Sequence, residues 1–360
     1  MDDLYIAGQK AIKTSSFKYK SQRYEANLLG ETRHLQKSLK DGTYKPSKGQ
    51  PLVINERGKV RHIVSNTLRD KAVNHYLTDE FIRPAIEPYL IYDNGASRVG
   101  KGVAFARERL VHHLRKYYAK HGNKGYILLM DFHNFYGSID HERAKAALLH
   151  FVKEEAICKV LDAVIDSFDG DVGIDMGNQI SQEIGVLLPY YIDNYVKIVR
   201  GQKYYARYSD DSYIISDDLE LLKQLQKEVA EMAARFGLEI HPAKTHIARI
   251  DKGFRYLQRQ YTLTETGKVI EKINPKSVTR ERRKLKAYKR KVDDGTIPLE
   301  DVETAFKSWI CANYKVMSNR QILNLIDLYG QLFGVTPEWP DPHRRLQRLT
   351  GQKHGRKIVQ

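Results

Sequence analysis

The sequence predicts an α+β fold. A continuous apolar run at residues 126–130 has the length of a buried strand, and β-rich segments on either side of residues 209–211 have the form of a hairpin. Other segments repeat apolar residues at helical spacing, most clearly residues 219–236, which end at Gly237. With 41% hydrophobic residues in a chain of 360, the protein can build one large core or two to three smaller ones.

The charge balance indicates an acidic polymer as a partner. Sixty basic residues against 44 acidic ones leave a net charge of +16, which suits a polyanion. The two cysteines lie far apart and form no CxxC pair, which argues against a disulfide framework or a zinc site and fits a reducing compartment. The sequence has neither a signal peptide nor an apolar stretch long enough to span a membrane, so we expect a soluble, cytoplasmic protein without a membrane partner.

The first 125 residues are predicted to contain helices and one hairpin. Two short β-prone runs surround Arg57-Gly58, and Lys59 and Arg61 lie on the second run, where they could meet phosphate. The other apolar residues of this part follow a helical period. The predicted elements are a basic helical arm over 1–50, the hairpin over 51–64, and helices over 66–90 and 102–121.

The rest of the chain alternates strands with helices and ends in a basic, helical lobe. Residues 276–291 contain nine Lys or Arg and one Glu, and the basic tail after residue 341 is expected to be flexible or ordered by a partner. The predicted helices cover 141–167, 184–199, 219–236, 299–315 and 319–333, and the predicted strands cover 126–130, 203–208 and 212–215, with two more near 238–250 and 253–263.

Two common catalytic patterns are absent, and a third is only approximated. Gly95 to Gly102 nearly spells a phosphate-binding loop, but Gly102 stands where that loop needs a hydroxyl for Mg²⁺, and the preceding strand is short at most. We instead expect a basic turn there that touches a backbone phosphate through Arg98 and Lys101. No H-E-x-x-H and no G-x-S-x-G is present, so hydrolase chemistry finds no support.

Acidic residues stand at two strand ends. Asp131 ends the strand over 126–130, and Asp210-Asp211 fills the hairpin turn. If the two elements are neighbours in one antiparallel sheet, the carboxylates can hold the two Mg²⁺ ions that nucleotidyl transfer to a 3′-hydroxyl requires. Taken singly, Asp210-Asp211 could be a turn of turn-forming residues, and Asp131 a helix cap.

Four ordered motifs resemble those of reverse transcriptases. Tyr208-Ser209-Asp210-Asp211 is similar to their Y-x-D-D motif, and the segment from Asp131 to His141 resembles their first catalytic motif as bacterial members write it. The intervening segment over 177–182 and the later lysine and primer-grip segments over 241–257 fit in order. The resemblance covers about residues 50–335 and implies a right-hand polymerase. Its parts would be an arm (1–50), fingers (51–125), a palm with a helical insertion over 141–170 (126–275), a thumb (276–335) and a tail (336–360).

The resemblance also implies catalytic roles. Asp131, Asp210 and Asp211 would hold two Mg²⁺ ions, for which Mn²⁺ can substitute, with the carbonyl of Phe132 as a further ligand. Lys244 would protonate the leaving pyrophosphate, although simple solvation of a strand end explains it almost as well.

Further residues would bind the nucleotide and the nucleic acid. Tyr136 would exclude the 2′-hydroxyl of ribonucleotides, or else be a core aromatic. The incoming nucleotide would also meet Lys59, Arg61, Arg69, Met176, Gly177, Ser181 and Gln182. Alternatively, the three cations among them only form a basic face in contact with solvent. The nucleic acid would meet Arg98, Lys101, Tyr208, Arg282, Arg283 and Lys286. The implied partners are an RNA template, a DNA or RNA primer, the cDNA product and dNTPs, with a small accessory protein or a dedicated non-coding RNA as possible additions.

Two departures from the usual motif narrow the subtype. Met176-Gly177 replaces the usual Gln-Gly, and Ser181-Gln182 replaces Ser-Pro, which resembles the reverse transcriptases of diversity-generating retroelements. Met176 offers no amide to fix base-pair geometry, so we expect an error-prone enzyme. The alternative is that Met176 merely packs under the motif loop. A standalone defence-associated reverse transcriptase of the abortive-infection type, acting against phage, is the alternative. A non-catalytic RNA-binding scaffold is a third hypothesis, opposed by three clustered carboxylates that would repel phosphate without metals.

Overall fold

The computed structural model describes residues 1–15, 19–56, 59–339 and 343–351, without the side chains of Glu56 and Lys59. It forms two compact units, residues 1–250 and 251–360, which we describe separately. Helices and antiparallel sheets occur in both units, so the predicted α+β class is confirmed. The expected boundary after residue 275 lies inside the second unit, because Ile273 and Val278 belong to one apolar core. The five-part division remains a prediction.

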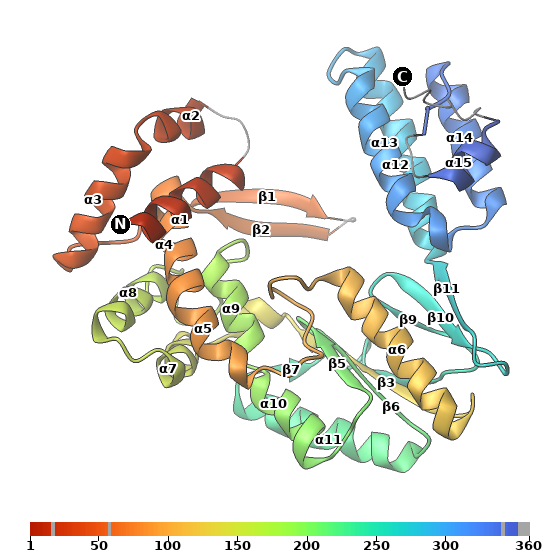
Figure 1. Cartoon of the computed structure of the whole chain (residues 1–360), viewed down its shortest axis with the longest axis horizontal. Coiled ribbons are helices and arrows are strands. Elements are labelled where there is room, and N and C mark those ends of the chain that lie inside the picture. Colours follow the sequence, from red (N-terminus) through yellow and green to blue (C-terminus); the bar gives the residue numbers. More distant parts are fainter. Residues whose placement is uncertain (16–18, 57–58, 340–342, 352–360) are drawn as a thin grey trace, which may run out of the picture. The chain divides into compact units, whose positions relative to one another are not determined.

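Helices and one hairpin make up the N-terminal part of the first unit, as expected (Figure 1). The hairpin pairs antiparallel, with Leu52 opposite Ile63, and its turn at 57–58 lies outside the described residues. Helix α1 packs against α4, and Leu4 and Val73 join the main core. The elements are α1 (Asp2–Lys13), α2 (Tyr19–Ala26), α3 (Leu28–Lys40), β1 (Gln50–Glu56), β2 (Lys59–Ser65) and α4 (Leu68–Leu77).

A four-stranded antiparallel sheet lies at the centre of the first unit. Its strand order is β5-β6-β3-β8, so the expected hairpin and the apolar strand are direct neighbours. The strands are β3 (Tyr126–Met130), β5 (Tyr205–Tyr208), β6 (Asp211–Ser216) and β8 (His246–Arg249). Beside it, β4 (Phe132–His133), which the sequence did not suggest, pairs with β7 (Glu239–Ile240), which lies within the strand expected near 238–250. The outer side of β5 is covered by residues 93–95, since Arg207 N–H donates to the carbonyl of Asp93 and Gly95 N–H to that of Arg207.

Helices cover both faces of this sheet (Figure 1). On one face lies α6 (Val103–His121), where His113 hydrogen-bonds the Tyr213 hydroxyl at 2.9 Å. On the other face α10 (Tyr190–Asn194) and α11 (Leu219–Arg235) enclose the main core with Tyr205 and Ile214. Side chains alternate between the two faces of a strand, and helices cover both faces here. Successive residues of these strands are therefore buried, which explains their continuous apolar sequence.

Three predicted helices are broken into shorter pieces. The helix expected over 184–199 is wrong as a single element, because Pro189 cannot donate the hydrogen bond that would continue it. The pieces there are α9 (Gln179–Leu187), α10 and a π-helical turn (Tyr195–Val199). The segment 141–167 divides into α7 (His141–Phe151) and α8 (Glu155–Ile165). The segment 66–90 contains α4, a π-helical turn (Thr78–Ile82), α5 (Arg83–Ile86) and a 3₁₀ turn (Glu87–Tyr89).

The second unit combines a small sheet with helices. Its sheet has the order β11-β10-β9 and its helices pack around Phe306, Tyr329 and Trp339. The tail after residue 341 was expected to be flexible or ordered by a partner, but residues 344–349 form a helix whose Leu346 is buried in this core. Residues 340–342 and 352–360 lie outside the described part. The elements are β9 (Phe254–Tyr256), β10 (Arg259–Leu263), β11 (Val269–Ile273), α12 (Pro275–Asp293), α13 (Leu299–Asn313), α14 (Asn319–Phe333) and α15 (Arg344–Leu349). Among the described helices of the chain, none is long and apolar enough to cross a membrane.

Candidate active site

The strand register brings Asp131 beside the hairpin turn. Met130 pairs with Ser212 across β3 and β6, so Asp131, the residue after β3, lies opposite Asp211 at the same end of these two inner strands, which we call the acidic edge. Tyr208 pairs with Asp211, and Ser209 adopts a left-handed φ of 55° that lets the chain reverse within two residues. Carboxylates from two elements about 80 residues apart therefore meet at one edge.

Burial and mutual repulsion disfavour the ionised forms of these carboxyls. Burial, then the charges of Asp210 and Asp131, raise the pKa of Asp211 to about 7. Burial and the charge of Asp131 also raise the pKa of Asp210. The carboxyl of Asp211 lies close enough to Asp131 to share a hydrogen bond with it. The edge thus carries more negative charge than its surroundings compensate.

Lys244 supplies one compensating charge. Its ammonium nitrogen lies 2.6 Å and 2.8 Å from the two carboxylate oxygens of Asp131. Backbone contacts fix this pair, because the Asp131 carbonyl accepts the His241 N–H at 2.7 Å and the Asp131 N–H donates to the Thr245 hydroxyl at 3.3 Å. The loop that carries Lys244 is therefore attached to the residue that Lys244 neutralises.

The donor set suits a divalent metal ion. Carboxylate oxygens are the ligands that Mg²⁺ prefers, and a cation here would relieve the repulsion that raises the pKa values of Asp210 and Asp211. In the part of the chain that the structure describes, no three acidic, His or Cys side chains are already grouped around one metal position. Both oxygens of Asp131 are engaged by Lys244, so a metal would share or replace that contact.

A buried ion pair that the sequence did not suggest is hydrogen-bonded to the acidic turn. Arg207 and Asp193 are each 1% exposed and are joined by bonds of 2.7 Å to 3.0 Å. The Arg207 guanidinium also donates to the carbonyls of Val186 at 2.8 Å and Ser209 at 3.1 Å. The charged Arg207 among the aromatic residues of 204–208 was the available sequence signal for a buried ion pair. Its partner, Asp193, could not be identified from residue spacing.

Tyr136 lies between the main core and the acidic turn. Its half-buried ring packs against the main core, 5.2 Å from the ring of Phe135. Its hydroxyl reaches the Ser209 side chain in the acidic turn, and burial raises its pKa. A Cβ atom at Gly185 would lie 3.1 Å from the Tyr136 hydroxyl, so the absence of a side chain at Gly185 gives Tyr136 its place.

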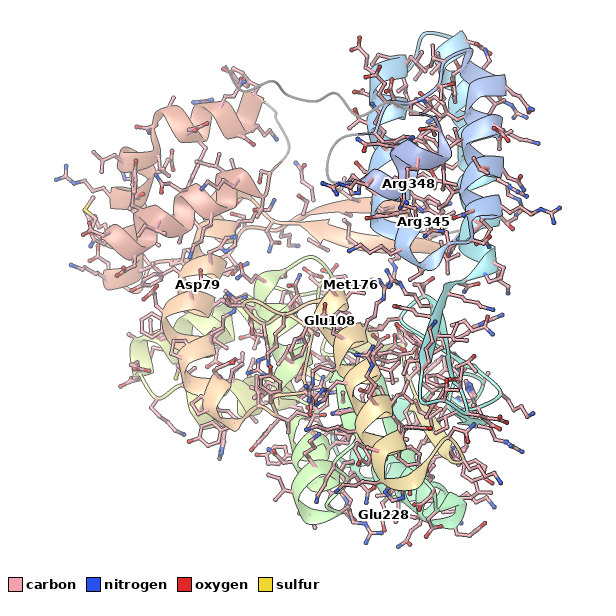
Figure 2. The ribbon with its side chains drawn as sticks, turned by 45° about the vertical axis from the view of Figure 1, so that its right-hand side comes forward. Asp79, Glu108, Met176, Glu228, Arg345 and Arg348 are labelled. Carbon is pink, nitrogen blue, oxygen red and sulfur yellow. The ribbon has the colours of Figure 1, made fainter. Side chains whose placement is uncertain are left out.

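The basic hairpin contacts the loop before α9. A guanidinium nitrogen of Arg61 lies 3.6 Å from the sulfur of Met176, which is labelled in Figure 2 and lies in this loop, three residues before α9 begins. Arg69 is instead held over the ring of Tyr44, at 5.3 Å. Lys59 begins β2, but its side chain lies outside the described part. Of the three predicted triphosphate-binding cations, Arg61 is the one seen against the middle motif.

The other middle-motif residues divide between a cavity and the interior. Gly177 and Gln182 line a cavity of about 340 Å³ together with Asn74. Ser181 is buried, and its hydroxyl finds no partner among the described residues. Phe132 is buried with its ring against Phe135 and pairs with Ile240. Of these predicted nucleotide-binding residues, Gly177 and Gln182 thus face a cavity, whereas Ser181 and Phe132 lie in the interior.

The predicted nucleic-acid contacts are found in several places. Arg98 is 8% exposed at its side chain, pairs with Glu87 and donates to the carbonyl of Ile91 at 2.7 Å. Lys101 donates to the carbonyl of Tyr92 at 2.6 Å. These two cations are used within the fold, so their contact with phosphate has no support here. Tyr208 is half-buried at the end of β5, and Arg282, Arg283 and Lys286 are exposed on α12 of the second unit.

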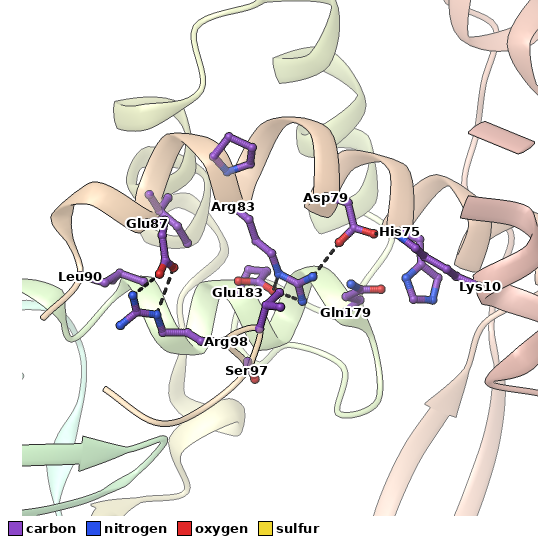
Figure 3. A pocket seen from close by; sticks show the side chains of 13 residues that line it. Lys10, His75, Asp79, Arg83, Glu87, Leu90, Ser97, Arg98, Gln179 and Glu183 are labelled. Carbon is purple, nitrogen blue, oxygen red and sulfur yellow. Dashed lines mark hydrogen bonds and ion pairs between the residues drawn. The ribbon is translucent and has the colours of Figure 1, made fainter. Parts of the chain in front are cut away.

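In the cavity drawn in Figure 3, the charged side chains also pair with one another. It has a volume of about 710 Å³ and lies between α4, α5, α9 and residues 97–99. Arg83 bonds Asp79 at 2.6 Å and Glu183 at 2.9 Å, and Lys10 bonds Asp79 at 2.7 Å. Burial raises the pKa of Glu183 to about 7 in spite of Arg83. Little unpaired charge is left to attract an ion.

The fold combines helices with antiparallel sheets, as in right-hand polymerases. Residues 45–260, more than half of the chain, match the family described as reverse transcriptase (RNA-dependent DNA polymerase). The chain therefore belongs to the reverse transcriptase family, whose members are RNA-directed DNA polymerases and generally use divalent metal ions. None of the curated proteins matches the sequence.

Solved telomerase structures are similar to this chain at low sequence identity. Apo telomerase from Candida tropicalis has a TM-score of 0.51 at 12% identity, covering 85% of this chain and 64% of its own. Telomerase from Candida albicans in complex with a TWJ fragment of telomeric RNA has a TM-score of 0.48 at 11% identity, covering 91% and 65%. A C-terminally truncated Candida tropicalis telomerase gives 0.46 at 12%, covering 67% and 59%. The chain thus spans about three fifths to two thirds of the length of these telomerases.

Proposed function

We propose that this protein copies an RNA template into cDNA from a DNA or RNA primer. The observation that carries the proposal is the meeting of Asp131, Asp210 and Asp211 at one sheet edge, with Lys244 on Asp131. Two divalent cations, Mg²⁺ or Mn²⁺, held by these carboxylates would neutralise the dNTP triphosphate and activate the primer hydroxyl.

The chain's own residues orient the reactants. Arg61, from the hairpin, supplies positive charge for the triphosphate, while Lys244 can deliver a proton to the leaving pyrophosphate. Tyr136 stands against the acidic turn and is proposed to exclude a 2′-hydroxyl. Arg98 and Lys101 are the least supported of the proposed nucleic-acid contacts, because both are engaged within the fold.

For the biological role, we propose an error-prone enzyme of a diversity-generating retroelement acting in the cytoplasm. Support comes from Met176, an apolar side chain beside Arg61 in the loop that would face the new base pair. A thioether adapts its shape and offers no amide donor, so this position discriminates weakly against mispairs. Phage defence is the alternative role, and ordinary fidelity of the enzyme would favour it. A dedicated RNA or a small accessory protein would supply the template context.

The test is primer extension on a defined RNA template with Mg²⁺ or Mn²⁺. Asp210→Asn should lower extension at least about a hundredfold, because a lost ligand charge weakens both metal binding and transition-state neutralisation. Asp217→Asn is the matched control, since Asp217 is exposed just beyond the opposite end of β6. Full extension by Asp210→Asn would remove the two-metal assignment, whereas inactivity of the parent on every primer would favour the scaffold hypothesis.

A further inference from the structure

A third cavity lies beside β5, an outer strand of the four-stranded sheet. It has a volume of about 540 Å³ and opens between α6, the π-helical turn Tyr195–Val199 and the residues that lead into β5. The residues that line it include five cations and one carboxylate: Asp93, Arg109, His112, His113, Lys116, Lys120, Lys197, Lys203 and Tyr204, with Ala119. We refer to it as the α6–β5 pocket.

The floor of the α6–β5 pocket is a fixed network around buried Asp93. Arg109 donates to one Asp93 oxygen at 2.5 Å and Lys197 to the other at 2.6 Å. Lys197 also donates to the carbonyls of Lys203 at 2.8 Å and Tyr205 at 2.9 Å. Although burial alone would raise it, contacts with His113 and Lys197 lower the pKa of Asp93, so the carboxylate stays charged. Two cations and one anion already leave this floor with a positive charge.

The rim of the pocket adds three free cations. Lys116, Lys120 and Lys203 are exposed, and within the described residues their side chains make no ion pair or hydrogen bond. With both histidines neutral, five cations against one carboxylate give the pocket a net charge of +4. In the cavity of Figure 3, by contrast, Lys10, Arg83 and Arg98 each meet a carboxylate.

The pocket is separate from the acidic edge. Lys203 and Tyr204 precede β5, while Asp210 and Asp211 follow its other end. The four residues of β5 span roughly 13 Å at about 3.3 Å per residue. A ligand bound in this pocket therefore contacts neither the proposed metal ligands nor Tyr136.

We propose that the α6–β5 pocket binds phosphate groups of an RNA backbone outside the catalytic centre. Lys and Arg side chains that neutralise phosphates release bound counterions, which is the main source of affinity for a nucleic acid. Three unpaired lysines around a prearranged positive floor provide such contacts in a hollow that also exposes the ring of Tyr204. The pocket would hold RNA that lies beyond the copied stretch, and it needs no catalytic turnover to do so.

The test measures RNA binding against salt concentration, without dNTPs. The variant Lys116→Gln/Lys120→Gln/Lys203→Gln removes the rim, and Lys153→Gln/Lys159→Gln/Lys227→Gln removes the same charge from exposed positions on or beside α8 and α11. Each lost contact flattens the slope of log K against log[salt] by about 0.7 to 0.9. We expect the rim variant to flatten by about 2 and to lose about a hundredfold in affinity near 0.1 M salt, and the control to change little.

Two further arms decide between explanations. Equal losses in both variants would attribute the effect to overall charge and overturn the proposal. In the parent protein, RNA should shift the ring resonance of His112, whose pKa is lowered by burial and by Arg109 and Lys116. If inorganic phosphate at the same concentration produces the full shift, the pocket is a small-anion site and the backbone proposal is wrong.

Extension of a short primer–template that fills only the catalytic centre provides the remaining check. The rim variant should extend it as the parent does, because none of the three lysines touches the acidic edge. A parent without extension would refute the proposed function while leaving the binding result intact, so the two failures are distinguishable. A rim variant that loses short-template extension together with RNA binding would contradict a site separate from catalysis.

Discussion

Asp193→Asn should destabilise the first unit strongly, because it leaves the Arg207 guanidinium buried without its counter-charge. The Arg207 side chain donates three hydrogen bonds to Asp193, and both side chains are 1% exposed. Removing one partner of a buried pair costs about 3–5 kcal/mol. In a unit of this size each kcal/mol lowers the melting temperature by about 2–4 °C, so a drop of about 6–20 °C is expected.

Thermal and urea unfolding, followed by circular dichroism, measure this cost. Asp217→Asn, an exposed substitution of the same chemistry, should change the melting temperature by little. Adding Arg207→Met to Asp193→Asn should recover part of the loss, since no uncompensated charge then remains. Primer extension well below the melting point should stay impaired in that double variant, because the Ser209 carbonyl has lost its donor. A cost below about 1 kcal/mol for Asp193→Asn would refute the reasoning.

Three further outcomes are expected. Tyr136→Ala should keep most dNTP incorporation and admit ribonucleotides, measured by extension with each substrate, and a variant as selective as the parent would make Tyr136 a core residue only. Met176→Gln should lower the error rate of cDNA sequenced from one defined RNA, most visibly at template adenines, whereas a parent already as accurate as ordinary reverse transcriptases would exclude the mutagenic role. Glu183 has a pKa of about 7 in the fold against an ordinary 4.5, so its ionisation costs stability as the pH rises from about 4.5 to 7. Glu183→Gln should therefore gain up to about 3 kcal/mol relative to the parent between pH 5 and pH 8, as measured by urea unfolding, and equal pH profiles would contradict this.

The strands of the site could be predicted because their signals are local. The apolar run over 126–130 and the aromatic arms around Ser209 have the length and turn chemistry of strands, and the structure forms β3, β5 and β6 there. The meeting of Asp131 with Asp211 was conditional, since it depends on β3 and β6 being neighbours. Sheet order follows from the packing of the whole unit, which no short segment encodes.

The remaining features depend on contacts between distant residues. Arg207 bonds Asp193, fourteen positions earlier. Asp193 lies in α10, which begins after a helix break at Pro189 that helical periodicity did not reveal. Leu346 is buried only because Trp339 and Tyr329 form a core for it, so the composition of the tail alone suggested flexibility. Lys244 could be placed near the site by its motif, but its bonds to both oxygens of Asp131 follow from the loop that Thr245 and His241 attach to that residue.

The segment that covers the outer side of β5 has a consequence for solubility and for control of the acidic turn. An uncovered edge strand is a template for pairing with another chain, and Asp93 and Gly95 occupy the backbone groups of Arg207 that would otherwise serve it. Aggregation through this edge would first require residues 93–95 to peel away. The same peeling would free the backbone of Arg207, three residues before Asp210, so a lesion that exposes the edge should also loosen the turn that carries the carboxylates.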